Sequence, residues 1–240
     1  ARALGARVHP GTPVLGIQPR HGGYDLRTPG GTVRARAVGI ATGAYTAASL
    51  TPLLRGRQMP ILSNSIVTRP LTSDEIESTR FRTTQVITDT RTLRFYYRRL
   101  PDNRVQIGSR SAITGADATH ERHLQLLIDG LHRKFPSLRG IDIDYSWWGW
   151  VDVSHDMMPR IFRPDPQQQL FYALGYGGNG VSYSAQAGRR MAEMIAGKTL
   201  KAHDLPIFTS PLPTHPLAPF RRMGQRMLYR WYYMRDEAAG

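Results

Sequence analysis

Cysteine is absent from the 240-residue sequence. This excludes a disulfide scaffold, a cysteine nucleophile, a thiolate metal site and any cofactor attached to this chain through a cysteine sulfur. Long apolar runs are also missing. No segment approaches the roughly 18–20 apolar residues of a membrane-spanning helix, and the N-terminal residues have no stretch typical of a signal peptide. We therefore expect a cytoplasmic location.

Lysine is nearly absent. It occurs at positions 134, 198 and 201 only, so 29 of the 32 basic residues are arginine, against 18 acidic residues and a net charge of +14. A GC-rich genome produces such an excess without any function behind it. The alternative is a polyanion-binding surface, which would gather its basic residues on one face. Most arginines are scattered, which favours the compositional interpretation, but none of the residues between Asp204 and Asp236 is acidic.

The length and the 40% of hydrophobic residues predict one large domain or two small ones with a real core. Strand-like segments at 14–18, 24–28 and 32–40, separated by glycine-rich turns, predict a β-meander. The run 37–41 lacks polar alternation, so we expect it to be buried on both faces.

Strands and helices are mixed along the rest of the chain. Strands are predicted at 60–69, 95–100, 104–109, 141–153 and 170–174, with 95–109 forming a hairpin, and helices are predicted to begin at 72–75 and to span 119–135 and 181–195. This order predicts an α+β or α/β fold.

A glycine-rich loop, 175–180, lies between a buried strand and a helix. Glycine lets backbone approach a ligand closely, and the amides at the start of the helix favour negative charge. The loop lacks the lysine of a phosphate-binding Walker loop and the downstream acid of a dinucleotide fingerprint. The spacing alone leaves open an anion or cofactor site and a simple tight turn.

Three motifs, in this order, resemble the C-terminal two-thirds of the FAD-dependent amine and amino-acid oxidases. They are Ile40-Ala41-Thr42-Gly43-Ala44-Tyr45 after the meander, Trp147-Trp148-Gly149-Trp150 followed by Asp156-Met157-Met158-Pro159, and the loop from Gly175 to Ser182 before Gly188-Arg189-Arg190-Met191-Ala192. The superfamily includes D-amino-acid oxidase, glycine oxidase and sarcosine oxidase. The sequence is most similar to the γ-glutamylputrescine oxidase branch, over about residues 1–200.

The resemblance implies FAD as cofactor and a definite domain plan. Residues 1–58 and 145–204 would form the meander and the C-terminal parts of an α/β FAD-binding domain. Residues 59–144 would form an inserted antiparallel-sheet domain that binds substrate, and 205–240 a basic helical extension.

The resemblance also implies where FAD is contacted. Ala41, Thr42 and Gly43 match the motif that lies against the pyrophosphate, and Val14 resembles the strand residue that contacts the adenine. The loop residues whose amides would face the pyrimidine end of the isoalloxazine are Gly177, Gly178, Asn179, Gly180 and Val181. A helix N-terminus there stabilises the negative charge that develops when flavin N5 accepts a hydride.

The implied reaction is oxidation of an amine or amino acid to an imine, hydrolysed to a carbonyl compound, typically with hydrogen peroxide as a product. Tyr96 and Arg98, with Arg110 nearby, occupy the region where relatives bind the substrate carboxylate, and Trp148 would wall the site. The preferred interpretation of Tyr96, Tyr97 and the arginines is a cross-strand pair with solvated charges. The tryptophans more often serve cores. No catalytic base is assigned.

The glycine-rich motif that opens this family's FAD domain is absent from the sequence. We therefore expect the chain to be the C-terminal portion of a longer flavoprotein, with the nucleotide-binding half as a partner, and to bind FAD poorly and be inactive alone. A basic module for nucleic acid or an anionic membrane, and a non-catalytic remnant, are the alternatives. No specific nucleic-acid ligand is expected.

The remaining polar clusters suggest no metal site. His120 and His123 are spaced three apart, unlike the zincin pattern, and a solvated helix face is expected. Asp156 is expected to order the turn after it and not to act as a base. At the C-terminus, Leu217, Phe220, Met227, Leu228, Trp231 and Met234 alternate with Arg221, Arg222, Arg226 and Arg230. This predicts a basic amphipathic helix that docks on its own body or on a partner subunit, in preference to an anionic membrane.

Overall fold

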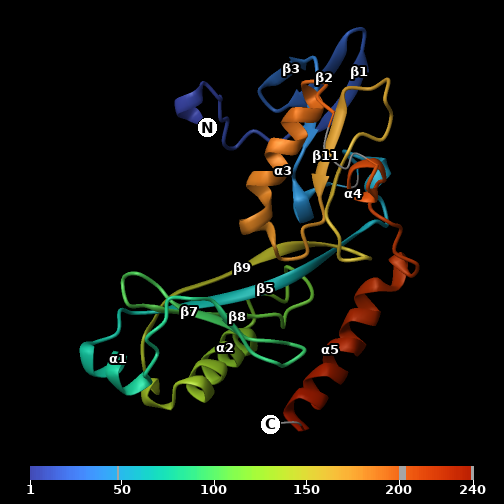
Figure 1. Cartoon of the computed structure of the whole chain (residues 1–240). Coiled ribbons are helices and arrows are strands. Elements are labelled where there is room, and N and C mark those ends of the chain that lie inside the picture. Colours follow the sequence, from blue (N-terminus) through green and yellow to red (C-terminus); the bar gives the residue numbers. More distant parts are fainter. Residues whose placement is uncertain (48, 200–203, 239–240) are drawn as a thin grey trace. The chain divides into compact units, whose positions relative to one another are not determined.

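The computed structural model describes residues 1–47, 49–199 and 204–238. Two compact units make up the chain (Figure 1). Unit 1 comprises Ala1–Met59 and Asp152–Pro216, and unit 2 comprises Pro60–Val151 and Leu217–Gly240. Across the described ranges, no helix combines the length and the apolar character needed to cross a membrane.

Unit 1 begins with the predicted meander. Strands β1 (Gly16–Arg20), β2 (Gly23–Thr28) and β3 (Gly31–Ala35) pair antiparallel in sequence order. Gly23 lies so close to β3 that a Cβ atom would be 2.2 Å from the Ala35 carbonyl oxygen, which explains glycine at the start of β2. The meander is confirmed, although β1 begins two residues after Val14.

The predicted strand 32–40 is wrong in one respect, because it is two strands in two sheets. After β3, β4 (Val38–Ile40) leaves the meander and pairs parallel with β11 (Leu170–Leu174), which pairs antiparallel with β10 (Arg160–Phe162). The reason is burial. Val38 and Ile40 are buried with Phe162 and Tyr172, whereas most of β3 is exposed.

A helix covers the other face of β4 and β11. Helix α3 (Gly180–Ile195) follows β11 directly and buries Ala187 against Ile161 and Ala173. Its Met191 lies against Gly39, where a Cβ atom would be 3.0 Å from the Met191 methyl group. The expectation that the run 37–41 is buried on both faces is wrong, because Val38 and Ile40 are buried on one face whereas Gly39 and Ala41 remain exposed. A short helix, α4 (Pro206–Thr209), contacts β10.

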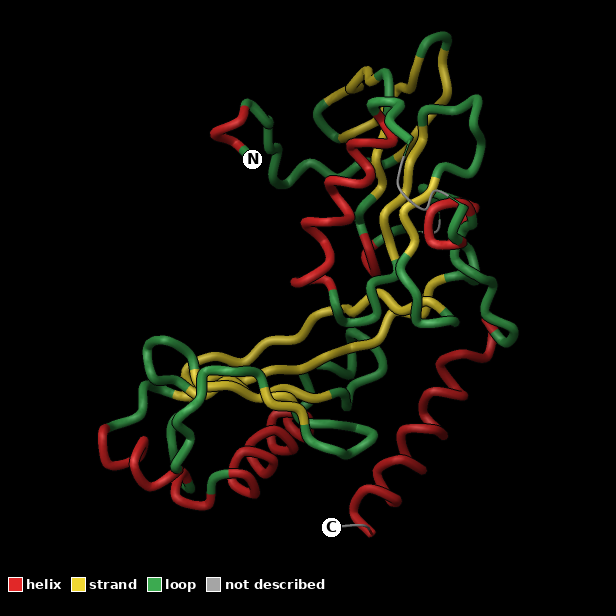
Figure 2. The backbone as a smooth tube through the Cα atoms, viewed as in Figure 1, coloured by secondary structure: helices red, strands yellow, loops and turns green. Residues whose placement is uncertain are grey.

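Unit 2 is built on a five-stranded sheet with the order β6-β7-β8-β5-β9 (Figure 2). Its strands are β5 (Gln58–Thr68), β6 (Ile87–Thr88), β7 (Tyr96–Arg99), β8 (Val105–Ser109) and β9 (Ile143–Ser154). The β7–β8 hairpin is confirmed, and β8 also pairs antiparallel with β5. The boundary between the units falls inside β5 and inside β9.

Helices α1 (Ser73–Thr79) and α2 (Glu121–Lys134) lie on one face of this sheet (Figure 2). Apolar residues of α2 recur at helical spacing and form the core with the sheet. The core side chains include Leu127, Leu131, Phe135, Ile66, Val105 and Ile107. Single 3-10 turns occur at Arg2–Leu4, Gly43–Tyr45, Pro52–Leu54, Pro136–Leu138 and Ala218–Phe220.

The C-terminal helix α5 (Arg221–Ala238) packs on unit 2 through its polar face. The Asp236 carboxylate accepts hydrogen bonds from the amides of Thr92 (3.1 Å) and Leu93 (2.9 Å), and Arg222 donates to the Pro60 carbonyl (2.8 Å). These contacts agree with docking on its own body. The apolar face of the helix does not form this contact, because Met227, Trp231 and Met234 are exposed.

The start of α1 yields a pH-dependent prediction. Thr72 caps the helix in a capping box, and Arg69 forms a bidentate pair with Glu75 at 2.7 and 2.8 Å. The hydrogen bonds from Arg69, followed by the Thr72 amide, lower the pKa of Glu75 from its usual 4.5 to about 2. A lowered carboxyl pKa stabilises the fold above the unfolded pKa, and this stability is lost as pH falls through the folded pKa.

We expect wild-type protein to be more stable than Glu75→Gln by about 1–2 kcal/mol above pH 5, allowing for solvent screening. The difference should disappear between pH 4.5 and about 2. Chemical unfolding at a series of pH values measures it. Glu77→Gln is the control, since Glu77 and its partner Arg82 are largely exposed. A difference in stability that is as large at pH 2 as at pH 5 would contradict the prediction.

Candidate functional site

The two predicted cofactor segments of unit 1 meet at one edge of a sheet. Because β4 and β11 are parallel neighbours, their carboxyl ends lie at the same edge. There β4 runs into Ala41, Thr42 and Gly43, and β11 runs into the loop from Gly175 to Gly180. The crevice outside the carboxyl ends of parallel strands is where such sheets usually bind ligands.

Two buried polar side chains join these segments. The Gln58 amide donates to the Gly43 carbonyl (2.9 Å) and to Oδ1 of Asp152 (3.0 Å). Oδ2 of Asp152 accepts from the Gly175 amide (2.7 Å), and the Asp152 carbonyl accepts from the Gly177 amide (2.8 Å). Asp152 and Gln58 therefore fix both loops in one arrangement.

Asp152 and Gln58 were not predicted from the sequence. Burial raises the pKa of Asp152, and the hydrogen bonds from the Gly175 amide and from Gln58 act in the opposite direction. A buried carboxylate is costly unless donors satisfy it, so Asp152 is present for a structural reason. A signal existed, since Asp152 interrupts an otherwise apolar run from Trp150 to Val153. Nothing in the local sequence singled out Gln58.

The N-terminus of α3 is open to a ligand. Asn179 occupies the N-cap position, but its side chain makes no capping hydrogen bond, and the first turn has no acidic residue. The Ser182 hydroxyl donates to the Asn179 carbonyl (3.1 Å) and so does not cap the helix either. Val181 is 100% exposed. The first-turn amides are thus available to an electron-rich group.

The backbone conformation of the loop before α3 allows a ligand to approach closely. Gly177 and Gly178 have φ angles of 59° and 97°, a region that residues with a Cβ atom rarely adopt. The space beside Gly178 is open, with no atom within 4 Å of the position that a Cβ atom would take. A surface of backbone amides without bulky side chains fits the edge of a planar heterocycle.

The partner segment has an accessible hydroxyl. Thr42 is exposed, its Oγ1 lies 2.6 Å from Oγ1 of Thr46, and Thr46 donates to the Gly43 carbonyl at 2.7 Å. The turn at Ala41, Thr42 and Gly43 is therefore ordered from within. Val14 is partly exposed and lies just before β1, and its contact with adenine remains a prediction.

In unit 2, the predicted substrate residues Tyr96 and Arg98 share one face of the sheet, because they are two residues apart along β7. The Tyr96 hydroxyl contacts the hydroxyls of Ser63 and Ser65, the latter at 3.3 Å. Its ring lies over Gly108, where a Cβ atom would be 2.4 Å away. Arg98 is exposed and donates to the cross-strand Gln106 (3.1 Å).

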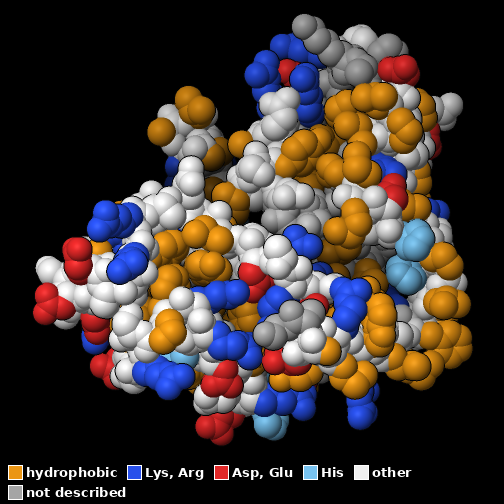
Figure 3. Space-filling model, turned by 60° about the horizontal axis from the view of Figure 1, so that its bottom comes forward, with side chains coloured by type: hydrophobic (Ala, Val, Ile, Leu, Met, Phe, Trp, Pro, Cys, Tyr) orange, Lys and Arg blue, Asp and Glu red, His pale blue; other side chains and the backbone are white. Residues whose placement is uncertain are grey.

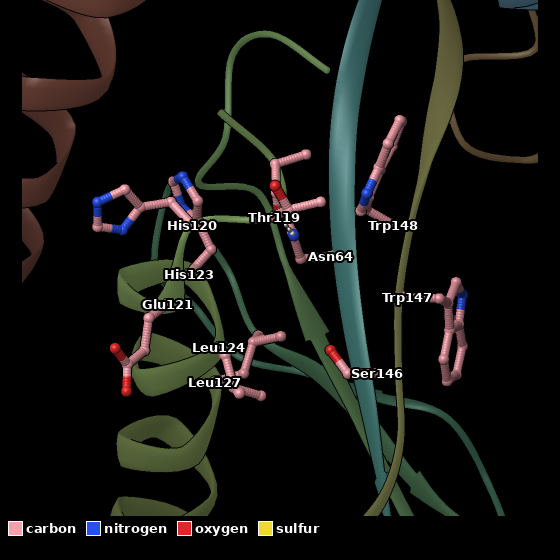
Figure 4. A pocket seen from close by; sticks show the side chains of 11 residues that line it. Asn64, Thr119, His120, Glu121, His123, Leu124, Leu127, Ser146, Trp147 and Trp148 are labelled. Carbon is pink, nitrogen blue, oxygen red and sulfur yellow. Dashed lines mark hydrogen bonds between the residues drawn. The ribbon is translucent and has the colours of Figure 1, made fainter. Parts of the chain in front are cut away.

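The structure does not bring Trp148 to these residues. Trp148 lines a pocket of about 710 Å³ together with Asn64 and the N-terminal end of α2 (Figure 4). Asn64 alternates with Ser63 and Ser65 along β5, so it lies on the opposite face from Tyr96. The neighbouring Trp150 packs on a small buried cluster.

Arg110 and Tyr97 also lie away from Tyr96. Arg110 donates to the Thr92 carbonyl (2.9 Å), and Tyr97 packs its ring on Phe81 and Phe135 in the core. Of the predicted substrate residues, only Tyr96 and Arg98 are adjacent.

The expectation of a solvated histidine pair is wrong for His123. His123 is buried, with Nδ1 2.8 Å from the Ser111 hydroxyl and Nε2 3.3 Å from Asp117. Burial lowers its pKa, against the opposing effect of Asp117. Figure 4 shows the Glu121 carboxylate pointing away from Asn64. Within the described ranges, no group of three His, Cys, Asp or Glu side chains is arranged to hold a metal.

Asp156 orders its turn, as predicted. Its carboxylate accepts from the Ser154 hydroxyl (3.0 Å) and the Met158 amide (3.1 Å), and it pairs with Arg160 at 2.5 Å. Burial opposes a low pKa, but Arg160 and these donors lower the pKa of Asp156 overall. A carboxylate held in this way is a poor proton acceptor.

One family of known proteins matches most of this chain. Residues 1–194 match the family model described as FAD dependent oxidoreductase. The chain belongs to this family. The predicted family, fold class and cofactor, FAD, are therefore confirmed. The family match includes both loops at the carboxyl ends of β4 and β11.

Two curated relatives of this family illustrate the similarity. Gamma-glutamylputrescine oxidoreductase from Escherichia coli is 31% identical over 98% of this chain and 54% of its own length. Glycine oxidase from Bacillus licheniformis is 24% identical over 87% of this chain and 54% of its own length. The chain thus spans about half the length of the curated relatives that it matches.

Solved structures share the fold. Glycine oxidase from Geobacillus kaustophilus superimposes with a TM-score of 0.68 at 21% identity, covering 84% of this chain and 52% of that one. Iminodiacetate oxidase from Chelativorans sp. BNC1 gives 0.65 at 19% identity, covering 82% and 53%. The mixed architecture of antiparallel sheets and helices is therefore that of FAD-dependent oxidases.

Proposed function

We propose that this chain supplies the flavin-contacting loops and a substrate-facing sheet of an oxidase of amines or amino acids. One observation supports this most strongly. The open N-terminus of α3 is held beside the Ala41–Gly43 turn by Gln58 and Asp152. A loop that served only as a tight turn would not need a buried carboxylate shared with a second loop.

When bound, FAD would supply the redox chemistry: its N5 atom would take a hydride from the substrate carbon next to the nitrogen, and oxygen would reoxidise the flavin to give peroxide. The substrate would leave as an imine, which water hydrolyses. The amides of Gly180 and Val181 would donate toward the electron-rich edge of the isoalloxazine and stabilise the charge that develops there. The Thr42 hydroxyl and the Gly43 backbone would bind the pyrophosphate. Val14 would contact the adenine.

In unit 2, Arg98 would bind a substrate carboxylate, and the Tyr96 hydroxyl would position the substrate. The relatives named for glycine and γ-glutamylputrescine act on amines that also carry a carboxylate. An exposed guanidinium suits such a group, because it donates two parallel hydrogen bonds. We assign 1–58 and 145–204 to flavin binding, 59–144 to substrate binding and 205–240 to a C-terminal extension.

The test is anaerobic flavin reduction. The full-length protein, loaded with FAD, is mixed with glycine, sarcosine, putrescine and γ-glutamylputrescine, and flavin absorbance is followed. We expect at least one amine to bleach the flavin and to give peroxide when oxygen is admitted. If no primary or secondary amine reduced the flavin, the proposal would be wrong.

Arg98→Gln separates a carboxylate-binding role from a purely cross-strand one. Glutamine can still contact Gln106, but it cannot bind a carboxylate as a cation. We expect KM for a carboxylate-bearing amine to rise about 10–100-fold with a small change in kcat, since charge-assisted hydrogen bonds contribute about 1.5–3 kcal/mol. An amine without a carboxylate is the control substrate. Equal KM values for wild type and variant would support the cross-strand interpretation.

A further inference from the structure

A groove lined with arginines lies between α2 and α5, entirely within unit 2. Its volume is about 600 Å³, and one acidic residue, Asp129, lines it. The six arginines that line the groove are Arg91, Arg110, Arg122, Arg133, Arg226 and Arg230. Arginines of the C-terminal helix, Arg226 and Arg230, therefore line the same groove as arginines from residues 91–133.

Carboxylates neutralise only part of this charge. Glu237 pairs with Arg91 (2.6 Å) and lies 3.5 Å from Arg133, while Asp117 pairs with Arg122. In the described part of the chain, no carboxylate lies within 4.0 Å of the guanidinium groups of Arg226 or Arg230, and both side chains are exposed. The groove therefore retains an excess of positive charge next to solvent.

The outward face of α5 is apolar. Met227, Trp231 and Met234 are 69%, 50% and 55% exposed. They lie opposite Gln225 and Asp236, which are buried against unit 2, because residues three, four and seven apart share a helix face. Figure 3 shows hydrophobic side chains beside Lys and Arg side chains on the face that it presents. An exposed apolar helix face flanked by arginines has the chemistry of an interfacial anchor.

We propose that α5 and the arginine groove dock the protein on an anionic phospholipid surface. The Met and Trp face enters the boundary between headgroups and acyl chains, and Arg226 and Arg230 contact lipid phosphates. Charge complementarity and the adjoining apolar face together favour this occupant. A nucleic acid would complement the arginines but would leave the Met and Trp face in water. This inference does not depend on flavin chemistry.

Vesicle sedimentation tests the proposal, using the full chain with neutral phosphatidylcholine vesicles and with vesicles containing phosphatidylglycerol. We expect binding to the anionic vesicles only, weakening as salt rises. The double variant Arg226→Gln/Arg230→Gln should bind about 25-fold more weakly, since each arginine near an anionic surface contributes about fivefold. The matched control is Arg34→Gln/Arg36→Gln, which removes two exposed arginines from unit 1 and should bind as wild type.

The apolar contribution has its own readout. Anionic vesicles should shift the tryptophan emission of the wild type to the blue, and Trp231→Phe should lose that shift while still binding. Equal binding to neutral and anionic vesicles, equal losses in the two double variants, or binding to a DNA oligonucleotide without binding to vesicles would overturn the proposal.

Discussion

Gly178→Val is expected to lower the rate of flavin reduction in the full-length protein by at least a hundredfold. Gly178 has a φ angle of 97°, where a β-branched residue is strained by about 1–3 kcal/mol. The loop would relax by turning its peptide groups, which moves the amides at the start of α3. Loss of one preorganised donor at a developing charge typically costs about 10²–10³ in rate.

The matched control for this variant is Gly188→Val in helix α3, which follows the loop. Gly188 has ordinary helical geometry, and no atom lies within 4 Å of the position of a Cβ atom there. Valine at 188 should leave the rate of reduction within a few-fold of wild type. Gly180→Val should also impair reduction, although less, because its φ angle is not in the left-handed region. Unchanged reduction in Gly178→Val would refute the assignment of this loop.

Asp152→Ala is expected to destabilise unit 1 and to weaken FAD binding together. Removing the carboxylate leaves the Gly175 amide without its acceptor. It also removes the hydrogen bond that Gln58 donates to Asp152, and Gln58 is the residue that holds the Gly43 carbonyl. Each unsatisfied buried polar group costs about 1–3 kcal/mol, so a total loss of about 2–5 kcal/mol is expected. Denaturant unfolding measures the stability, and flavin titration measures the affinity.

Two further variants identify the cause of this effect. Asp152→Asn keeps one acceptor for the Gly175 amide and should show an intermediate loss. Asp165→Ala removes a carboxylate that accepts hydrogen bonds from the neighbouring Gln167 amide and Gln168 side chain in the turn between β10 and β11, and it should leave FAD affinity unchanged. Equal FAD affinity in Asp152→Ala and Asp165→Ala would show that Asp152 does not organise the loops.

Local patterns were sufficient for most elements of the fold. The apolar spacing from Leu124 to Phe135 predicted α2, and the hydroxyl and acids at 72–75 predicted the start of α1. The separation of β3 from β4 was not predictable locally, because neither Arg36 nor Ala37 is a turn residue. Tertiary burial of Val38 beside β11 decides it.

The candidate site was predictable where backbone alone forms it. Glycines between a strand and a helix left open a ligand loop and a tight turn, and the resemblance to the FAD-dependent oxidases implied the segment from Gly177 to Val181. Gln58 and Asp152, which hold the loop, belong to strands distant in the sequence, and little in the local sequence indicates this role. His123 was misjudged although the signal was present, since His123 is four residues before Leu127 and shares its buried face.

Helix α5 shows why amphipathic pattern alone does not determine orientation. The pattern identifies an apolar face and a basic face, and burial of the apolar face is the usual expectation. Here Asp236 satisfies two backbone amides of unit 2, and Gln225 is buried beside Arg222. Specific hydrogen bonds to one surface outweigh the general preference, which leaves the apolar face outward.

The parallel pairing of β4 with β11 has a consequence for biosynthesis. Val38 pairs with Leu170, more than a hundred residues later in the chain, and all of the strands and helices of unit 2 except α5 are encoded between them. On the ribosome, β4 emerges long before β11. Until β11 is made, the backbone hydrogen-bonding groups of β4 lack this partner strand and its apolar side chains stay exposed. Such long-range pairing slows folding and exposes the nascent chain to aggregation. The meander, complete by Ala35, can form much earlier.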